Sequence, residues 1–362
     1  MMAWPNVVDS SRKSSNLRVL VLGLDGATFD LLEPWIDEGR LPNLAEAIRQ
    51  GVWGRLQSIV PPYSVPAWMS FATGKYPAKH GMASFWRFSP GLGTRTLNSA
   101  KSLRSATIWS ILSDMGRWVG VVNVPGTYPP VPINGFMISG LMTPKEHVDY
   151  TYPLELKREV LQAAGDYAAN PYASVSQTIK FLRQVIYWER KREIAHRHLL
   201  AGHEWDFFIN VVQGLDPIQH KFWQYMDLNH PNFRQAEAQR YAPLLEECYA
   251  VVDEVVGHRL SLVDERTVLF IISDHGFGPV HKYFHVNRFL ANHGLIAFKE
   301  GRPYGLQTRI RSWQGRVLSL AAASVRRLDF LGLRRGLLNN VMRHQLNRVL
   351  DLASTPSIDW SR

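Results

Sequence analysis

The stretch Leu17-Arg-Val-Leu-Val-Leu-Gly-Leu-Asp-Gly26 decides the fold of this chain. Apart from Arg18, residues 17–22 are all valine or leucine, which is typical of a strand buried on both faces of a parallel sheet. The strand runs into a turn, so the carboxylate of Asp25 stands just past its C-terminal end. Ligands of open α/β sheets bind at the carboxyl ends of the strands, and Asp25 is therefore the first candidate for a functional site.

Further apolar runs with the same character follow, and helical patterns separate them. The sequence predicts strands over 118–123, 206–212 and 267–273, and helices over 42–50, 66–73, 105–115 and 234–260. Strands that alternate with helices predict an α/β fold with a mostly parallel central sheet and helices on both of its faces.

Composition excludes several classes of protein. The chain has 362 residues, of which 46% are hydrophobic and 20% charged, so it is neither disordered nor fibrous. Its single cysteine, Cys248, excludes an internal disulfide and a cysteine-based zinc cluster. No run reaches the roughly 18 apolar residues of a membrane span, and the N-terminal residues lack the apolar core of a secretory signal. We therefore expect a reduced, cytoplasmic setting.

Changes in composition divide the chain into four parts. We assign a catalytic core to 17–126 and 201–298, and a cap or insert to 127–200, which is rich in tyrosine and proline and then helical. Apolar residues at helical spacing predict an arginine-rich helical hairpin over 299–350. We expect residues 351–362 to begin a further, missing C-terminal part of the core.

The net charge of +10 is concentrated in residues 301–350, which hold ten arginines and a single acid, Asp329. The basic character therefore belongs to one segment, and it does not favour a nucleic-acid-binding protein. Two roles stay open for 302–348. In the first, the segment is a solvated helix face or a cap whose charge attracts anionic substrate. In the second, the segment makes peripheral contact with a membrane. The oligomeric state is not predicted.

Three of the predicted strands lead into aspartates, namely Asp25, Asp216 and Asp274. His220 follows Asp216 by one helical turn, and His275 is adjacent to Asp274. Each feature alone has an ordinary structural explanation. A single aspartate at a strand end is often the N-cap of the next helix, and an Asp-x-x-x-His pair is often a pair on the protein surface. The coincidence of all five at strand ends favours a metal site, and mixed oxygen and nitrogen donors suit zinc or manganese better than calcium.

Ser64 lies in a proline-rich turn, 59–68, that enters the helix predicted over 66–73. A serine at or just before a helix N-terminus is usually a cap. The same position also presents a hydroxyl beside backbone N–H groups that bind anions.

Together these segments resemble the alkaline phosphatase superfamily. Val19-Leu-Val-Leu-Gly-Leu-Asp-Gly26 is similar to its opening strand, and Pro62-Tyr-Ser-Val-Pro-Ala-Trp68 to the nucleophile segment of type I phosphodiesterases and nucleotide pyrophosphatases. Gly214-Leu-Asp-Pro-Ile-Gln-His220 and Ser273-Asp-His-Gly-Phe277 resemble the two later metal motifs. Asn123-Val-Pro-Gly-Thr-Tyr-Pro-Pro130 is similar to the bacterial branch of predicted phosphohydrolases or phosphomutases.

The resemblance implies a metal-dependent phosphohydrolase or phosphodiesterase that cleaves a small-molecule phosphate ester through a phosphoserine intermediate. It implies that Ser64 is the nucleophile and that two divalent metal ions, zinc first and manganese second, are the cofactors. By the same resemblance, Asp25, Asp274 and His275 hold the first metal together with Ser64. Asp216 and His220 hold the second.

The resemblance also leaves one ligand of the second metal open. In the family this ligand is a histidine far downstream, and the rival here is that His281 or His285 replaces it. We expect weak activity or none from these 362 residues alone, with the first metal site retained. The alternative function is a weak or inactive truncated homologue that acts as a binding protein through 302–348.

Two departures from related families limit the substrate. Nucleotide pyrophosphatases have a phosphate-binding asparagine shortly after the His-Gly of the nucleophile segment, and His80-Gly-Met-Ala-Ser-Phe-Trp86 has none. Nucleotide specificity therefore stays open. Ser64-Val-Pro-Ala-Trp68 lacks the arginine of the sulfatase motif, which argues against a sulfatase.

Overall fold

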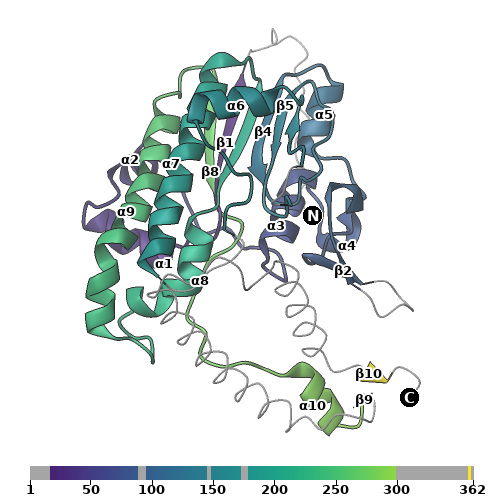
Figure 1. The fold of residues 1–362 in the computed structure, drawn as a ribbon, viewed down its shortest axis with the longest axis vertical. Helices are drawn as coiled ribbons and strands as arrows, with labels where there is room; N and C mark the ends of the chain where they lie inside the picture. The colour runs from purple at the N-terminus through teal and green to yellow at the C-terminus, as the bar shows by residue number, and fades with distance from the viewer. Residues whose placement is uncertain (1–16, 89–94, 145–147, 173–177, 299–357, 360–362) are drawn as a thin grey trace, which may run out of the picture. The chain divides into compact units, whose positions relative to one another are not determined.

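The computed structural model describes residues 17–88, 95–144, 148–172, 178–298 and 358–359 (Figure 1). The chain forms two compact units, one up to Pro279 and the other from Val280 onward. The predicted core range 201–298 is therefore divided between the two units.

A six-stranded sheet forms the centre of the first unit, in the order β6-β5-β4-β7-β1-β8. Its strands are β1 (Arg18–Leu24), β4 (Val119–Val124), β5 (Gly135–Ser139), β6 (Thr151–Tyr152), β7 (Phe207–Val212) and β8 (Thr267–Ile272). Every pairing is parallel except that of β5 with the edge strand β6. The prediction of a mostly parallel α/β sheet is confirmed.

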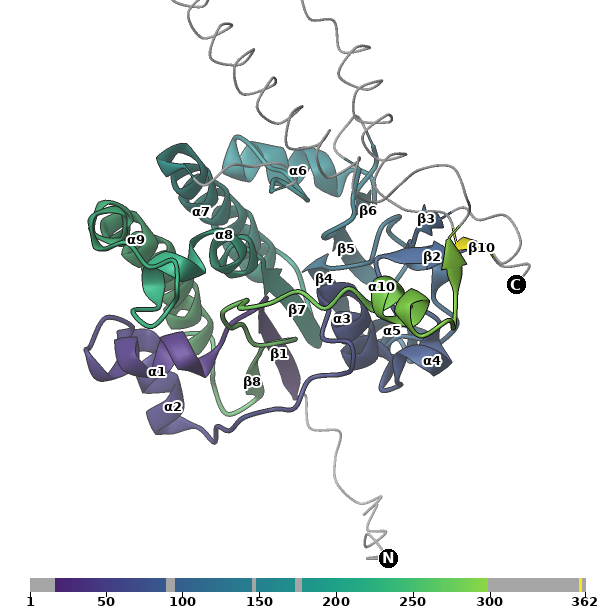
Figure 2. The same cartoon turned by 90° about the horizontal axis from the view of Figure 1, so that it is seen from below.

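Helices cover both faces of this sheet, as predicted. They are α1 (Phe29–Asp37), α2 (Pro42–Gln50), α3 (Ser64–Thr73), α4 (Pro77–His80), α5 (Ile108–Asp114), α6 (Leu156–Ala164), α7 (Ile179–Gly202), α8 (Leu215–Met226) and α9 (Gln235–Leu260). Figure 2 shows α3 and α5 on one side of the sheet, and α7 and α9 on the other. Residues of β1 alternate between the two layers, because Val21 lies in a buried cluster with residues of α3, whereas Leu20 lies in a cluster with residues of α7 and Leu22 in one with residues of α9.

The segment 127–200 differs from the predicted cap or insert. Its strand β5 pairs with β4 inside the central sheet, and β6 extends the same sheet. Ala195 and Leu199 of α7 share a buried cluster with Leu20 of β1, so α7 is a core helix. A five-residue strand between proline-rich loops leaves too short an apolar run for the sequence to reveal it.

The second unit is described only in part. Its elements are α10 (Val286–Asn292), β9 (Ala297–Phe298) and β10 (Ile358–Asp359), and β9 pairs with β10 in antiparallel fashion. The predicted hairpin over 299–350, with the basic segment 302–348, lies outside the described residues. Within the part of the chain that is described, no helix combines the length and the apolar character that crossing a bilayer requires.

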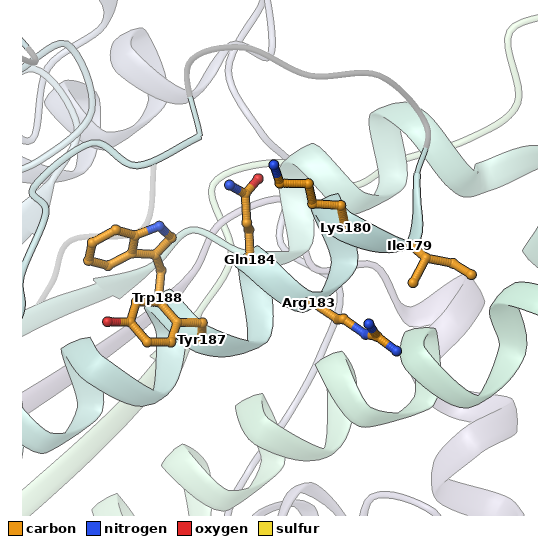
Figure 3. A pocket seen from close by; sticks show the side chains of 6 residues that line it. All are labelled: Ile179, Lys180, Arg183, Gln184, Tyr187 and Trp188. Carbon is orange, nitrogen blue, oxygen red and sulfur yellow. The ribbon is translucent and has the colours of Figure 1, made fainter. Parts of the chain in front are cut away.

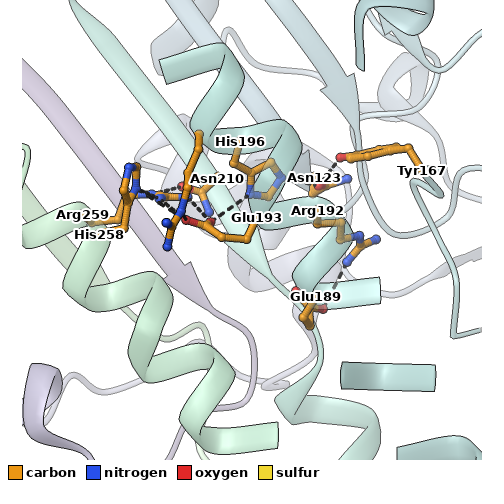
Figure 4. A network of polar contacts seen from close by, with 10 residues as sticks. Asn123, Tyr167, Glu189, Arg192, Glu193, His196, Asn210, His258 and Arg259 are labelled. Carbon is orange, nitrogen blue, oxygen red and sulfur yellow. Dashed lines mark hydrogen bonds and ion pairs between the residues drawn. The ribbon is translucent and has the colours of Figure 1, made fainter. Parts of the chain in front are cut away.

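A buried ion pair joins α7 to α9 beneath the sheet (Figure 4). Arg259 is fully buried and donates two hydrogen bonds to the carboxylate of Glu193, at 2.9 and 2.7 Å. Its Nε also donates to Oδ1 of Asn210 in β7, at 3.2 Å. Because the guanidinium is satisfied on several sides, the pair connects two helices and a strand without leaving its charge exposed to the apolar core.

A neutral histidine extends this network to β4. Burial, followed by the charges of Arg259 and Arg192, holds the pKa of His196 well below its usual range. The neutral imidazole lies 3.1 Å from Oδ1 of Asn123 through its Nε2, and the same oxygen accepts the Tyr167 hydroxyl at 2.6 Å. Asn123 can therefore sit fully buried inside the sheet because its oxygen is satisfied from two sides.

We predict that Glu193→Gln lowers the free energy of unfolding by about 3–5 kcal/mol, because it leaves the buried Arg259 charge without its counter-ion. Urea unfolding measures the loss. Glu246→Gln is the matched control, since it removes an ion pair with Arg40 in which both side chains are more than two-fifths exposed. This control should cost about 0–1 kcal/mol, and equal losses in the two variants would contradict the assigned role of the pair.

Candidate active site

The candidate site lies at the carboxyl ends of three adjacent strands. In the sheet, β1 is flanked by β7 and β8, and all three are parallel. Asp25 follows β1 directly, Asp216 lies in the first turn of α8 after β7, and Asp274 follows β8. The strand order therefore brings together three carboxylates that are far apart in the sequence.

Ser64 is the first residue of α3 and is almost completely buried. Its hydroxyl donates to Oδ1 of Asp25 at 3.1 Å, and its Oγ lies 3.2 Å from Nε2 of His275. The helix begins here because Tyr63 is still extended and Pro66 fits the first turn, where its missing N–H is not needed. The sequence prediction that Ser64 stands at a helix N-terminus is confirmed.

One ring nitrogen of His275 faces the carboxylates. Its Nδ1 lies 2.9 Å from the carbonyl oxygen of Gly276, which can only accept, so Nδ1 carries a proton. Nε2 lies 3.7 Å from Oδ1 of Asp25, 3.9 Å from Oδ1 of Asp216 and 3.4 Å from Oδ2 of Asp274. This arrangement leaves the Nε2 position for a metal ligand, with the ring orientation fixed from the other side.

The carboxylates at this edge of the sheet are buried and close to one another, which favours a bound cation. Burial raises the pKa of Asp25 well above its usual value, and the charges of Asp274 and then Asp216 raise it further. Burial also raises the pKa of Asp274, whose Oδ2 is buried and has no hydrogen-bond partner among the described residues. Crowded carboxylates with an unsatisfied oxygen fit a divalent metal, which would supply both the charge and the missing contact.

Three of the predicted ligand residues lie close together, and His220 lies outside this group. Asp25, Asp216 and His275 each offer one atom, all within 4.8 Å of one another, and this group could hold a metal ion. The predicted division, which assigned Asp216 and His220 to the second metal, stays a prediction. Nε2 of His220 is 3.3 Å from Oδ1 of Asp216, and the His220 side chain is 65% exposed.

Sequence reasoning missed two contacts that hold the carboxylates in place. The indole Nε1 of Trp68 donates to Oδ2 of Asp25 at 3.3 Å, and the backbone N–H of Gly26 donates to Oδ1 of Asp274 at 3.0 Å. The spacing of Ser64 and Trp68, four residues apart in one helix, is the signal that points to the first contact. His281 and His285 belong to the second unit, and their role as substitute ligands stays a prediction.

Several hollows lie on the first unit, and two of them differ in how they lie relative to the candidate site. One of about 730 Å³ reaches from His275 and Gly276 along the edge strand β8, and its lining is largely apolar. The other lies against the first turns of α7 (Figure 3), and Ile179, Lys180, Arg183, Gln184, Tyr187 and Trp188 line it. Only the first of these hollows includes a predicted site residue, so it is the one adjacent to the chemistry.

Two solved structures of known proteins are similar to this chain in fold. Phosphonoacetate hydrolase from Sinorhizobium meliloti 1021, solved with phosphonoformate, is similar in fold, with a TM-score of 0.55 at 19% identity over 80% of this chain and 66% of that one. Murine ectonucleotide pyrophosphatase / phosphodiesterase 5 gives a TM-score of 0.45 at 13% identity, over 79% of this chain and 64% of that one. The chain thus spans slightly less than two thirds of the length of these structures.

The family match covers most of the sequence. Residues 19–351 match the family described as Type I phosphodiesterase / nucleotide pyrophosphatase. The match includes nearly all of β1, the start of α3, the first turn of α8 with Asp216, and the loop that carries Asp274 and His275. With the mostly parallel sheet and the converging carboxylates, it confirms the resemblance to the alkaline phosphatase superfamily, and the chain belongs to the type I phosphodiesterase / nucleotide pyrophosphatase family.

Proposed function

We propose that this protein is a metal-dependent phosphoric ester hydrolase that uses Ser64 as its nucleophile. One observation carries the proposal. The Ser64 hydroxyl lies at the start of α3, 3.1 Å from Asp25 and 3.2 Å from His275, beside the group that could hold a metal. A serine that served only as a cap would need neither the buried carboxylates nor the imidazole around it.

Two divalent ions are the proposed cofactors, zinc in preference to manganese, because the donors include imidazole nitrogen as well as carboxylate oxygen. Asp25, Asp274 and His275 would hold the first with Ser64, and Asp216 and His220 would contribute to the second. When bound, such ions lower the pKa of a hydroxyl and neutralise charge on phosphoryl oxygens.

Residues around Ser64 orient its hydroxyl and favour the binding of a phosphoryl group beside it. Asp25 accepts the hydrogen bond of the Ser64 hydroxyl and so fixes the direction of its oxygen. In the proposed step the Ser64 hydroxyl gives up its proton and its Oγ forms a bond to phosphorus, while the bond from phosphorus to the ester oxygen breaks and that oxygen takes up a proton to leave as the alcohol. Water then cleaves the phosphoserine, which restores the Ser64 hydroxyl and releases the phosphoryl group bonded to the oxygen of that water. The backbone N–H groups of Ser64 and Val65 at the start of α3 favour the anionic phosphoryl group, whereas Pro66 has no N–H and the N–H of Ala67 donates to the carbonyl oxygen of Tyr63.

The proposed substrate is a small-molecule phosphate ester. The choice between monoester and diester is open to assay, as is the choice between zinc and manganese. The alternative, a binding protein that acts through 302–348, rests on a segment outside the described residues, and no described contact favours it.

We predict that Ser64→Ala lowers the turnover of p-nitrophenyl phosphate and bis(p-nitrophenyl) phosphate by about 10⁴-fold or more, as expected when a nucleophile is removed. Assays with zinc and with manganese measure the loss. Ser70→Ala is the control, because Ser70 lies in the same helix but contacts His80, at 3.0 Å, and not the carboxylates. Wild-type turnover in Ser64→Ala would end the assignment.

We predict that metal binding releases protons. Because the folded-state pKa of Asp25 is raised above its usual value of 3.8, the protonated form is favoured in the metal-free fold. The metal-free protein should therefore lose stability as the pH rises from about 4 through the raised pKa, and metal should oppose this loss.

Calorimetry in buffers of different ionisation enthalpy counts the released protons, and thermal unfolding between pH 4 and 8 with and without zinc tests the trend. Asp25→Asn is the matched variant, because it removes the titrating carboxylate and should flatten the stability profile of the metal-free protein. A zinc affinity that does not change with pH would contradict the prediction.

A further inference from the structure

Helix α3 holds one carboxylate at two points. Ser64 and Trp68 are four residues apart and therefore lie one above the other on the same face of the helix. The Ser64 hydroxyl donates to Oδ1 of Asp25 at 3.1 Å, while the Trp68 indole donates to Oδ2 at 3.3 Å. The two oxygens of one buried aspartate thus have separate donors that come from a single helix.

The indole of Trp68 has no room to turn away. Its side chain is fully buried in the cluster between α3 and the sheet, together with Val21 and Val211. A Cβ atom on Gly23 would lie only 2.3 Å from the indole Cη2, so β1 accommodates this ring by having no side chain at that position. Packing therefore fixes the direction of the indole N–H toward Asp25.

The division of the two oxygens matters for the site. Oδ1 of Asp25 is the oxygen close to Ser64 and to Nε2 of His275, at 3.1 and 3.7 Å. Oδ2 is the oxygen that accepts the hydrogen bond of the Trp68 indole. Without that donor, Oδ2 would be a buried acceptor with one partner fewer, and the carboxylate could rotate to offer it elsewhere.

We propose that Trp68 is a positioning residue that holds Oδ2 of Asp25 and so presents Oδ1 alone to Ser64 and a bound divalent cation. The inference rests on the proposed metal-dependent function and adds a residue to it. Partners of this kind orient metal ligands, and their loss typically weakens metal binding by about 10- to 100-fold. A purely structural tryptophan would contribute packing and leave metal affinity unchanged.

The test measures zinc affinity on the full chain by competition with a chromophoric chelator. Trp68→Phe should bind zinc about 10- to 100-fold more weakly than the wild type. Trp109→Phe is the matched control, because Trp109 is a buried indole in the same cluster. Both variants lose an indole from one core, so similar losses of stability with different zinc affinities separate positioning from packing.

A second replacement keeps the shape of the side chain. Substitution of Trp68 by β-(3-benzothienyl)alanine puts sulfur in place of the N–H and retains the volume of the ring, and it decides the matter if Trp68→Phe does not fold. Weakened zinc binding in the benzothienyl protein supports the inference, even if no phosphate ester is hydrolysed. Wild-type zinc affinity in that protein overturns the inference, even if the wild-type chain is an active hydrolase.

Discussion

Three carboxylates held at one buried edge of an apolar sheet are the constraint on which the rest of this structure depends. Asp25 and Asp274 are almost completely buried, and Asp216 lies close enough for its charge to act on both. Like charges in such a place oppose folding unless protons or cations compensate them. The fold tolerates this cost because β7, β1 and β8 are parallel neighbours whose apolar residues fix the positions of their ends.

The two faces of the sheet contribute differently to holding these carboxylates. On one face α3 brings Ser64 and Trp68 to Asp25, and on the other face α7 and α9 supply a large apolar layer with the ion pair of Glu193 and Arg259. The ion pair is satisfied within the chain, since each charged group has its counterpart. The carboxylates are not, because Oδ2 of Asp274 has no partner among the described residues.

Much of this arrangement could be predicted from the sequence. The central strands are mostly apolar, so β1, β4, β7 and β8 were predicted to within two residues at each end, and the three aspartates follow from their positions after those strands. The order of the strands in space is not visible in such patterns, and the short β5 was therefore assigned to a cap. The contact of Trp68 with Asp25 was missed because the four-residue spacing from Ser64 indicates only a shared helix face, and a buried tryptophan on that face fits ordinary core equally well.

The buried polar residues of the core include the neutral His196 and the carboxylates of the candidate site. His196 is buried among polar partners, yet its pKa is lowered and it stays neutral, so it costs little to keep inside. The same cause, burial that disfavours the charged form, raises the pKa values of Asp25 and Asp274, and the charge of Asp216 raises them further. A fold that only needed to fill this position could have used asparagine, as it does at Asn123 and Asn210 inside the strands. The carboxylates of Asp25 and Asp274 differ from these amides in carrying a negative charge that a divalent cation would balance.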